Sequence, residues 1–457
     1  MEATLLKKKC LFMVVALLIT GLGWWPQMGM AGEGRDSGDP TILKKLAERF
    51  SYDLRILTYG ITQDPADSTQ NPGNNFLQIP RYLGDLEIRP DLRLNLDPLE
   101  LSAKPRMKLE YRAWQEGFRK GDAEWKDDWY VNEWLARWKA RENLFLSYGR
   151  ENLQWGPSFL FSPSNPFFRD NGRRNPFLEV PGMDFGRLVW IPKSSWTLSF
   201  IANTDEGQNK PNGPNRYLIS PLPPFGKTYS LKVDYTGREN YGSVVLSYRE
   251  DSEYLLGFFG GGTISDAILL YGEGVIAKGN EGLYPQQDSS PFGASMQKLH
   301  QNDVNTVLLL GGSYTFEGKG TLTLEYVYYS PGYSNAEADR YYSLRRKAGE
   351  AFELGGPLSG FGQMVLGQTA VTGLRLLRRN YALLQYTQTN ILNVMDLTLR
   401  WTQNLDDGSF QFTTVVGYSL GNHWELFSAG TVNGGNGDSE FRSILNYQWM
   451  VGVKYTL

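Results

Sequence analysis

Side chains that could carry out chemistry are scarce in this 457-residue chain. It has two histidines, His300 and His423, and neither has a metal-ligating partner at a useful spacing. Neither lies in a motif that positions a nucleophile, and the glycine triplet at 260–262 lacks the lysine and hydroxyl residue of a phosphate-binding loop. We therefore expect no catalytic residue, no metal site and no cofactor, and the chain is not predicted to be an enzyme.

Charged residues, by contrast, alternate regularly with apolar residues over long stretches. Residues 86–97 read LEIRPDLRLNLD, and residues 106–113 read RMKLEYRA. A period of two is typical of a β-strand whose two faces meet different surroundings. In a sandwich the apolar face points inward, whereas in a membrane barrel it meets lipid and the charged face lines the lumen. Alternation alone leaves both folds open.

The charged face of the second to fifth predicted strands is the candidate solute pathway, together with one strand farther along the chain. Neighbouring strands lie ~4.8 Å apart, so opposite charges on this wall can pair. A basic excess in a lumen favours anions or polar sugars, whereas a salt-bridged wall could also brace the barrel without touching solute. The predicted lumen-lining residues are Arg89, Arg93, Arg106, Lys108, Arg112, Arg137, Arg150, Glu87, Asp91, Glu110, Glu133 and Arg400.

Connection lengths decide between the two folds. We predict about 18 strands, with 16 as the alternative, at 52–61, 84–96, 105–114, 129–139, 142–150, 183–192, 195–203, 228–236, 240–249, 253–261, 265–277, 303–317, 320–330, 380–389, 394–404, 409–419, 423–431 and 446–457. The long links are all odd-numbered connections, at 62–83, 115–128, 151–182, 204–227, 278–302 and 331–379. Short periplasmic turns alternating with long external loops are typical of an up-and-down barrel. The predicted fold class is therefore all-β, a transmembrane antiparallel up-and-down β-barrel.

The N-terminus carries the features of a secretory signal. Three lysines at 7–9 precede an apolar run over 10–25, and small residues follow up to Ala31. Its removal takes away three Lys and one Glu, which leaves 43 of 46 basic and 48 of 49 acidic side chains. This balance gives no reason to expect a nucleic-acid partner. The expected organisation is a signal peptide at 1–31, a short periplasmic segment at 32–51 and a transmembrane barrel at 52–457.

Residues 151–182 interrupt the strand pattern with prolines, asparagines and aromatic residues. Proline lacks the backbone donor that a strand ladder needs, so this stretch is predicted to be a loop. Because it is rich in apolar residues, we expect it to fold into the mouth or lumen and narrow the channel, with an external cap over the rim as the alternative. A helix-like run at 336–355 is expected as a plug element or a solvated loop helix. The expected constriction residues are Trp155, Pro157, Asn165, Arg169, Arg173 and Arg174.

The last residues, Tyr447 to Leu457, alternate aromatic or branched side chains with polar or small ones. This strand resembles the C-terminal signal that outer-membrane barrels present to their assembly machinery, although the usual terminal residue there is aromatic. Aromatic residues at predicted strand ends suit the girdles that flank the apolar band of such barrels. These residues are Tyr148, Trp190, Trp196, Tyr248, Tyr328, Tyr329, Trp401 and Trp424.

A second resemblance lies in residues 149–190, where GR-x-x-x-x-WGP is followed by SPSNP and PGMDFGRL. This segment resembles one in capsule-assembly outer-membrane barrels that hold surface polysaccharide, and the broader pattern looks like alginate-export and other porin-like families. The resemblance implies an 18-stranded barrel that binds or passes an anionic glycan. Capsule-assembly barrels also carry a periplasmic helical bundle, for which this chain offers only the short helical run 41–50.

These observations predict a porin-like outer-membrane channel in which small polar or anionic solutes diffuse through a charge-lined lumen. The alternative is a surface-polysaccharide binding, assembly or export barrel with a plugged lumen, in which Trp125, Trp129 and Trp155 stack on sugar rings. The expected partners are outer-membrane lipid, the barrel assembly machinery through Tyr447–Leu457, and a small polar or anionic solute or a glycan. The expected location is the cell outer membrane.

Overall fold

The computed structural model describes residues 46–168, 171–208, 225–250, 253–280, 282–300 and 302–457. The chain divides into two compact units, 1–51 and 52–457. The described part of the first unit is one helical turn at 46–49 and the start of the first strand. The signal peptide expected at 1–31 lies outside the described residues. Among the described residues, no helix is both long and apolar enough to cross a membrane.

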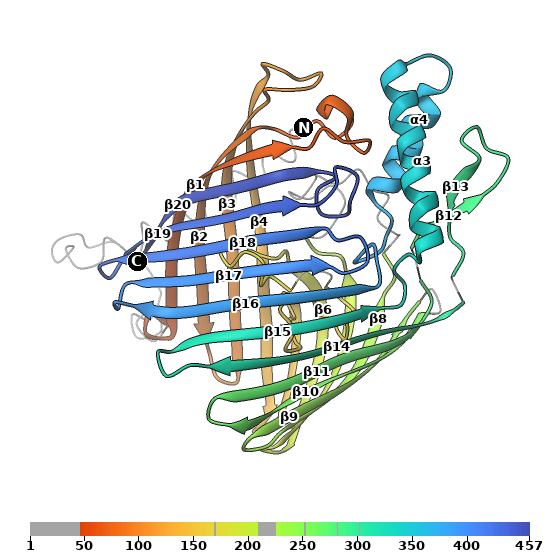
Figure 1. Cartoon of the computed structure of the whole chain (residues 1–457). Coiled ribbons are helices and arrows are strands. Elements are labelled where there is room, and N and C mark those ends of the chain that lie inside the picture. Colours follow the sequence, from red (N-terminus) through yellow and green to blue (C-terminus); the bar gives the residue numbers. More distant parts are fainter. Residues whose placement is uncertain (1–45, 169–170, 209–224, 251–252, 281, 301) are drawn as a thin grey trace, which may run out of the picture. The chain divides into compact units, whose positions relative to one another are not determined.

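Within the described part of the second unit, eighteen strands join into one antiparallel sheet that closes on itself (Figure 1). Each strand pairs with the next strand of the sheet along the chain, and β1 pairs with β20, which closes the barrel. This confirms the predicted all-β barrel of antiparallel strands. The strands are β1 (Phe50–Pro65), β2 (Tyr82–Asn95), β3 (Leu99–Ala113), β4 (Ala123–Arg141), β5 (Leu144–Glu151), β6 (Met183–Lys193), β7 (Trp196–Asp205), β8 (Thr228–Thr236), β9 (Asn240–Arg249), β10 (Glu253–Ser265), β11 (Ile268–Lys278), β14 (Val304–Thr315), β15 (Gly320–Tyr329), β16 (Asn380–Ile391), β17 (Met395–Asn404), β18 (Phe410–Leu420), β19 (Trp424–Gly434) and β20 (Leu445–Thr456).

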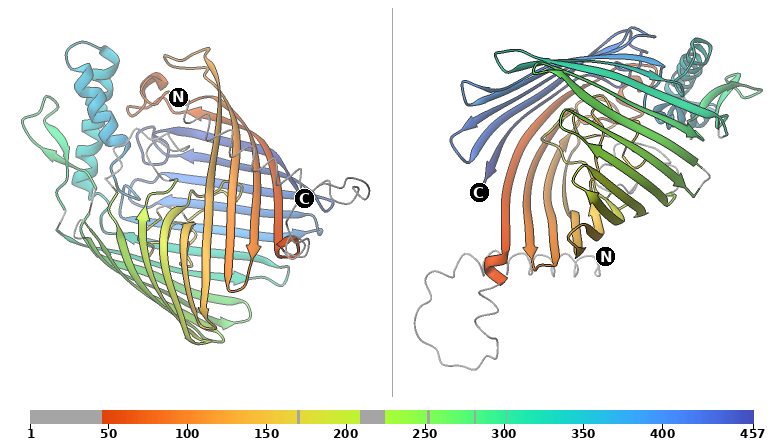
Figure 2. Two further views of the ribbon diagram at one scale, coloured as in Figure 1. Left: turned by 180° about the vertical axis from the view of Figure 1, so that it is seen from behind. Right: turned by 90° about the horizontal axis from the view of Figure 1, so that it is seen from below.

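The connections alternate between the two ends of the barrel as expected. At one end every turn has two to four residues, from 96–98 between β2 and β3 to 421–423 between β18 and β19. The long connections all lie at the other end. Figures 1 and 2 show that this end also carries helices α3 (Asn335–Leu354) and α4 (Ser359–Ala370) and the hairpin of β12 (Tyr284–Gln287) and β13 (Ala294–Gln297). The helical run expected at 336–355 corresponds to α3, whereas α4 and the hairpin were not expected.

Strands β3 and β4 begin six residues earlier than the sequence predicted, at 99 instead of 105 and at 123 instead of 129. Their ladder runs from Leu99↔Trp138 to Ala113↔Ala123 and passes through Pro105. A register shift next to this proline accommodates the missing backbone N–H, which would otherwise interrupt the ladder. The two strands therefore present a longer charged face than the sequence indicated.

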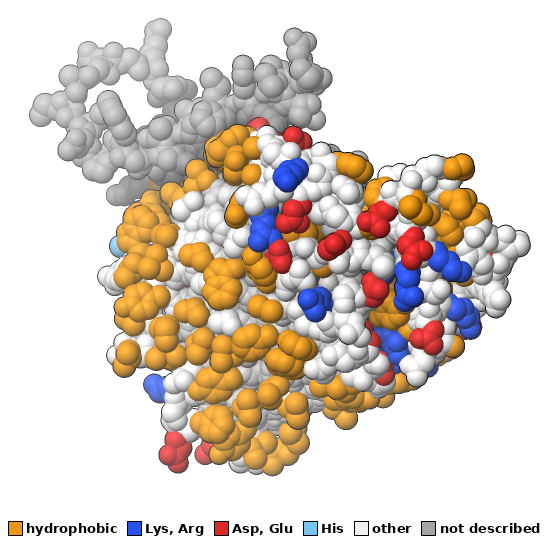
Figure 3. All heavy atoms as spheres, turned by 45° about the horizontal axis from the view of Figure 1, so that its top comes forward, with side chains coloured by type: hydrophobic (Ala, Val, Ile, Leu, Met, Phe, Trp, Pro, Cys, Tyr) orange, Lys and Arg blue, Asp and Glu red, His pale blue; other side chains and the backbone are white. Residues whose placement is uncertain are grey.

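The outer face of the sheet is covered by exposed apolar side chains, which is the reverse of a soluble protein and is typical of a membrane barrel. On β14, Leu308 and Leu310 point outward and are 44% and 67% exposed, whereas Val307 and Leu309, which alternate with them, are buried inside. Figure 3 shows hydrophobic side chains covering much of the outside of the strands. A globular sandwich would not leave this many large apolar side chains in water, and lipid is the environment that satisfies them.

Exposed aromatic residues gather near both ends of the strands. This is the arrangement expected for interfacial girdles, although Tyr329 is an exception because it is buried against Phe161, with 6.2 Å between ring centroids. The exposed aromatic residues include Trp138, Trp190, Trp196, Tyr235 and Trp424 at the short-turn end and Tyr82, Tyr148, Tyr229, Tyr248 and Tyr254 at the long-loop end.

The long connections pack around a hydrophobic core of their own, formed by α3, α4, the β12–β13 hairpin and the segment near Phe76. Helix α3 begins with a capping box, in which the Ser334 hydroxyl accepts from the Glu337 N–H and the Glu337 carboxylate accepts from the Ser334 N–H. The Tyr341 hydroxyl donates to the Thr369 carbonyl at 2.8 Å and ties α3 to the end of α4. These loops therefore form a folded layer at one end of the barrel.

Loop 435–444 is held to its neighbours by one carboxyl group, that of Glu440. It accepts the N–H of Leu377 at 2.9 Å, the hydroxyl of Tyr381 at 2.5 Å and the side-chain amide of Asn404 at 2.7 Å. Burial raises the pKa of Glu440 to about 7, and the negative charge of Asp407 acts in the same direction. We therefore expect the stability of this loop's attachment to change with pH near neutrality.

Candidate functional site

The loop at 152–182, which connects β5 to β6, folds into the barrel. Its first half bonds to lumen-facing residues of β11 and β15. Its second half contacts β17, β19, β2 and β3. Because these strands lie at separate positions around the closed sheet, the loop crosses the lumen. The structure has the inward arrangement that we expected, not the external cap.

Two buried carboxylates fix the first half of this loop. On β15, Glu325 accepts the N–H groups of Phe159 and Leu160 at 2.7 and 3.2 Å, and the hydroxyl of Ser158 at 3.2 Å. On β11, Glu273 accepts the N–H and hydroxyl of Ser164 at 3.0 and 2.6 Å. Hydrogen bonds to a charged group contribute about 1.5–3 kcal/mol each, so the two carboxylates hold the loop strongly.

Gly156 allows the loop to approach these carboxylates. Its φ is +84°, and a Cβ at this position would lie 2.6 Å from Ser162 Oγ and 2.7 Å from Glu273 Oε1. Only glycine combines this left-handed backbone with so close a contact. Arg173 then holds the same turn from the other side, because its guanidinium donates to the carbonyls of Gly156, Pro157 and Ser158 at 2.6–3.0 Å.

The second half of the loop is anchored on the opposite wall. The ring of Phe177 stacks on Phe427 of β19, with 4.1 Å between ring centroids and an interplanar angle of 19°. Arg89 of β2 donates to the Phe177 carbonyl at 3.1 Å, and Arg106 of β3 pairs with Glu179 at 2.6 Å. The loop is therefore fastened on both sides of the lumen.

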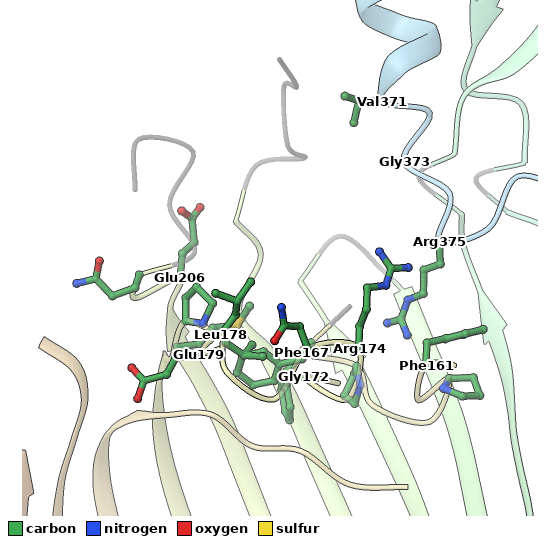
Figure 4. A pocket seen from close by; sticks show the side chains of 18 of the residues that line it. Phe161, Phe167, Gly172, Arg174, Leu178, Glu179, Glu206, Val371, Gly373 and Arg375 are labelled. Atoms are coloured by element: carbon green, nitrogen blue, oxygen red, sulfur yellow. The ribbon is translucent and has the colours of Figure 1, made fainter. Parts of the chain in front are cut away.

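A cavity of about 1040 Å³ lies over the loop at the long-loop end of the barrel. Figure 4 shows Phe161, Phe167 and Leu178 of the loop at its floor, with the side chains of Arg174 and Arg375 pointing into the space. The strand wall contributes charged side chains, including Asp85, Glu87, Arg89, Lys108 and Glu110. The cavity thus combines an apolar floor with a charged wall.

Most of the predicted lumen-lining residues on β2 and β3 meet in two neighbouring groups of ion pairs, one around Arg106 and one around Lys108, which together form the charged network of this wall. The network holds Arg89–Glu87 at 2.6 Å, Arg106–Asp91 at 2.8 Å, Lys108–Glu110 at 3.1 Å and the pair Arg112–Glu110. Its remaining members were not predicted, namely Arg55, Asp85, Glu124 and Glu179. Asp53, Arg119 and Asp122, which were not predicted either, extend it through Arg55 and Glu124. The network then contains six cations and eight carboxylates, so the expected basic excess on this wall is absent.

The other predicted wall residues lie outside this network. Lys104 pairs with Glu133 at 2.9 Å, Arg137 pairs with Glu100, and Arg150 pairs with Asp184 at 2.7 Å. Arg93 has no carboxylate within ion-pair distance in the described parts of the chain. A second cavity of about 200 Å³ is lined by residues that include Asp91, Arg93, Glu133 and Arg150.

Arg400 of β17 lies outside the network, on a strand separated from β2 by β18, β19, β20 and β1. It is 8% exposed, and it donates to Gln385 Oε1 at 2.8 Å and to the Arg173 carbonyl at 2.9 Å. None of the carboxylates in the described ranges forms an ion pair with Arg400, Arg173 or Arg174. Arg174 lines the large cavity, and none of the described residues accepts a hydrogen bond from its guanidinium.

The remaining expected loop residues have mainly internal roles. Asn165 is fully buried, donates to the Leu153 carbonyl at 2.9 Å and accepts the N–H of Phe167 at 3.0 Å. Pro157 contributes its carbonyl to Arg173. Arg169 lies outside the described residues.

The three tryptophans of the polysaccharide alternative do not converge. Trp155 lies in the lumen loop, with its ring 5.8 Å from that of Phe167 and 5.5 Å from Lys232 Nζ. Trp125 lies on β4, 68% exposed, against Tyr111. Trp129 follows Trp125 on the same strand. Two of the three rings therefore lie on β4 and the third lies in the lumen loop.

Further residues that the sequence analysis missed include Glu273, Glu179, Arg375 and Tyr271, whose hydroxyl donates to Glu325 Oε1 at 2.7 Å. Glu273 lies in the polar phase of YGEGV, which signals an inward position, but its partners are more than 100 residues away. Arg375 lies in a long connection and donates to the carbonyls of Ser162 and Asn165 at 2.9 and 3.1 Å. Strand periodicity carries no information about such contacts.

The arrangement can select solutes by size and charge. The described residues contain no group of three or more His, Cys, Asp or Glu side chains that could hold a metal ion. What they present is a loop across the lumen, a charged wall and arginines held by carbonyl groups. Such fixed charges beside a narrowing lower the free energy of a passing solute of opposite charge and raise that of a solute of like charge.

Comparisons with known proteins bear on the fold. No protein-family model matches the chain, and no curated protein matches it by sequence. Among solved structures, Acinetobacter baumannii OccAB1 matches with a TM-score of 0.54 and 11% identity, covering 90% of this chain and 97% of that one. Pseudomonas aeruginosa OccK7 (OpdD) matches with a TM-score of 0.50 and 11% identity, covering 89% and 98%.

A third similar structure is the outer membrane protein OprD from Pseudomonas aeruginosa, with a TM-score of 0.49, 10% identity and coverage of 90% and 94%. At these identities the likeness concerns the fold. OccAB1 and OccK7 match nearly from end to end, which agrees with the closed sheet and the outward apolar face. The chain therefore has the fold of a porin-like outer-membrane β-barrel.

Proposed function

We propose that this chain is a channel of the outer membrane, in which small polar or anionic solutes diffuse through the barrel past loop 152–182. The observation that carries the proposal is the inward loop beneath a charge-lined cavity of about 1040 Å³ inside a closed barrel. A narrowing fixed on both sides of a lumen limits the size of what passes. No chemical step is involved.

The charged side chains of the lumen have two different roles in this proposal. The ion-paired network on β2 and β3 has no basic excess, so we assign to it the holding of the wall and the loop and a hydrophilic surface. Selectivity for anions is assigned to arginines that form no ion pair with a carboxylate of the described residues, of which Arg174 lines the cavity. This division differs from the sequence-based expectation, in which the β2 and β3 arginines form the filter.

The direct test is single-channel conductance of the refolded full chain in a planar bilayer, with the reversal potential measured across a salt gradient. We expect steady ohmic steps with a preference for anions, and larger steps after deletion of residues 155–175. A matched control shortens the β12–β13 turn at 288–293, which should leave the steps unchanged. Silence from the intact barrel, with conductance only after the loop deletion, would favour the plugged polysaccharide barrel instead.

We also propose that β20 is the segment recognised during insertion of the barrel into the membrane. It pairs with β1 and completes the closure, and its outward residues Trp449 and Val451 are exposed. Truncation before Tyr447 should abolish the heat-modifiable folded band in outer-membrane fractions. Normal insertion of the truncated chain would contradict this assignment.

A further inference from the structure

The lumen loop is held by a second part of the chain, the segment 371–379 that joins α4 to β16. Arg375 of this segment donates to the carbonyls of Ser162 and Asn165 at 2.9 and 3.1 Å. Its guanidinium also lies 5.7 Å from the ring centre of Phe161. Figure 4 shows the side chain of Arg375 extending from this segment toward the lumen loop. The position of the segment therefore affects how firmly the lumen loop is held.

The same segment is tied, two residues later, to loop 435–444. The Leu377 N–H donates to Glu440 Oε1 at 2.9 Å. Because each residue spans at most about 3.6 Å of chain, a displacement of this backbone is carried to the arginine two residues away. Phe441, which follows Glu440, packs in the same hydrophobic cluster as Phe161 of the lumen loop. Loop 435–444 is therefore connected to the lumen loop by a hydrogen-bonded path and by a packed contact.

The Glu440 side chain is partly buried, and its carboxyl is enclosed by groups from several elements. A second acid, Asp407 in the turn between β17 and β18, accepts the Glu440 N–H at 3.0 Å. The hydroxyl of Tyr381 donates to the carboxyl from β16, and those of Tyr341 and Tyr342 on α3 lie within reach of its charge. None of these groups is a cation, so none of them compensates a negative charge on Glu440.

The cations on the surrounding elements bond to other groups. These pairs are Arg345 with Asp438, Arg378 with Asn335, Arg379 with Glu337 and Arg442 with Asn446. Of the described residues, none with a positive charge lies within ion-pair distance of the Glu440 carboxylate. An ionised carboxyl withdrawn from water without a cation is unfavourable, so burial, together with the charge of Asp407, raises the pKa of Glu440 to about 7.

We propose that the proton on Glu440 controls how firmly the lumen loop is seated. With the proton, loop 435–444 and segment 371–379 stay attached to each other, and Arg375 holds the lumen loop. Without the proton, an uncompensated charge weakens this attachment, and the lumen loop leaves its seat more often. The inference names a regulation of the proposed channel and rests on that function for its meaning, because it makes the width of the passage depend on the pH at the long-loop end.

Hydrogen exchange of the refolded full chain, corrected for the intrinsic pH dependence of exchange, tests this regulation. The carboxyl ionises near pH 4.5 when the loop is detached and near pH 7 when it is attached, so a rise in pH between these values favours detachment. We expect protection of the Leu377 amide to fall by up to about tenfold per pH unit between about pH 5 and 7 and to level off above about pH 8. The amides at 159–164 should follow the same profile.

Two variants separate the Glu440 carboxyl from other carboxyls. Glu440→Gln keeps an acceptor for the Leu377 N–H but cannot ionise, so its Leu377 amide should stay protected up to about pH 8. The matched control is Glu353→Gln, which removes an exposed carboxyl near the end of α3 and should keep the profile of the parent.

Arg375→Met tests the connection to the lumen loop, because it removes the donors to Ser162 and Asn165. The Leu377 amide should keep its pH profile in this variant, whereas the amides at 159–164 should lose the part of their pH dependence that Glu440→Gln also removes. This comparison sets aside any pH dependence that comes from the carboxylates of the strand wall, which both variants retain.

Protection of Leu377 that does not change with pH would overturn the inference, and so would a profile that Glu440→Gln leaves unchanged. Lumen-loop amides with the same pH profile in the parent and in Glu440→Gln would also overturn it. Single-channel recordings are a separate measurement, in which we expect larger and noisier steps at pH 8 than at pH 5. A barrel that conducts equally at both values contradicts only this inference, and a silent barrel with the expected exchange profiles contradicts only the channel function.

Discussion

Replacement of Gly156 by alanine should release the lumen loop without unfolding the barrel. The position has φ +84°, and an added Cβ would lie 2.6 Å from Ser162 Oγ and 2.7 Å from Glu273 Oε1. The left-handed backbone costs roughly 1–2 kcal/mol for a residue with a Cβ. Overpacking against the carboxylate that holds the loop costs roughly 1–3 kcal/mol more.

The sum, roughly 2–5 kcal/mol, corresponds to a decrease of about 30- to 3000-fold in the population of the seated loop. Hydrogen exchange of the amides at 159–164 should report this change, because those groups bond to Glu325 and Glu273. Single-channel recordings should show larger and noisier steps. The eighteen-strand sheet does not include the loop, so the circular dichroism of the variant should match that of the parent.

Gly421→Ala is the matched control. Gly421 also has a positive φ, +71°, but nothing would lie within 4 Å of a Cβ added there, and it sits in a short turn at the other end of the barrel. The Gly421→Ala variant should have the same cost of a left-handed backbone, but hydrogen exchange at 159–164 should be unchanged. If Gly156→Ala exchanged and conducted like the parent, the proposed seat of the loop against Glu273 would be wrong.

Three further changes test other parts of the account. Glu325→Gln replaces an acceptor of four hydrogen bonds by an amide, so exchange at Phe159 and Leu160 should rise by at least tenfold, corresponding to about 1.5 kcal/mol; unchanged exchange would contradict the anchor. Arg106→Gln leaves Glu179 without its cation and Asp91 with Arg55 alone, and it should destabilise the barrel toward urea by about 3–5 kcal/mol, with the reversal potential unchanged if this wall is structural. The raised pKa of Glu440 means that the folded state binds more protons than the unfolded state between about pH 4.5 and 7, so thermal stability should fall over this window as pH rises, by up to roughly 3 kcal/mol. Glu440→Gln should flatten that slope, and an identical slope in the variant would refute the assignment.

The barrel was predictable because one physical rule governs all of its strands. Each strand separates lipid from lumen, so its side chains alternate, and the pattern is visible in runs such as 86–97 without any knowledge of pairing. Helix α3 was also predictable, since its capping box, Ser334 and Glu337, and its heptad-like spacing are local. Helix α4 reads SGFGQMVLGQTA, in which three glycines and no strong amphipathic period hide the helix.

The candidate site was predictable only in its components. The sequence indicated that the charges of β2 and β3 face the lumen and that 151–182 is an unusual loop. It could not indicate that Glu179 in the loop neutralises Arg106 or that Glu273 receives the loop, because both contacts depend on how the chain closes in space. The expected basic excess of this wall is therefore absent. Among the described residues, the arginines without an ion pair include Arg93 on β2 as well as Arg174 in the loop and Arg400 on β17.

Liposome swelling with neutral solutes of increasing size tests the central claim most directly, since it detects passage through the barrel without relying on charge. Proteoliposomes containing the intact chain should swell in small polar solutes such as glycerol and arabinose and should stop swelling at a definite solute size. Deletion of 155–175 should move that limit to larger solutes. Failure of the intact protein to pass even the smallest solute would contradict the channel function.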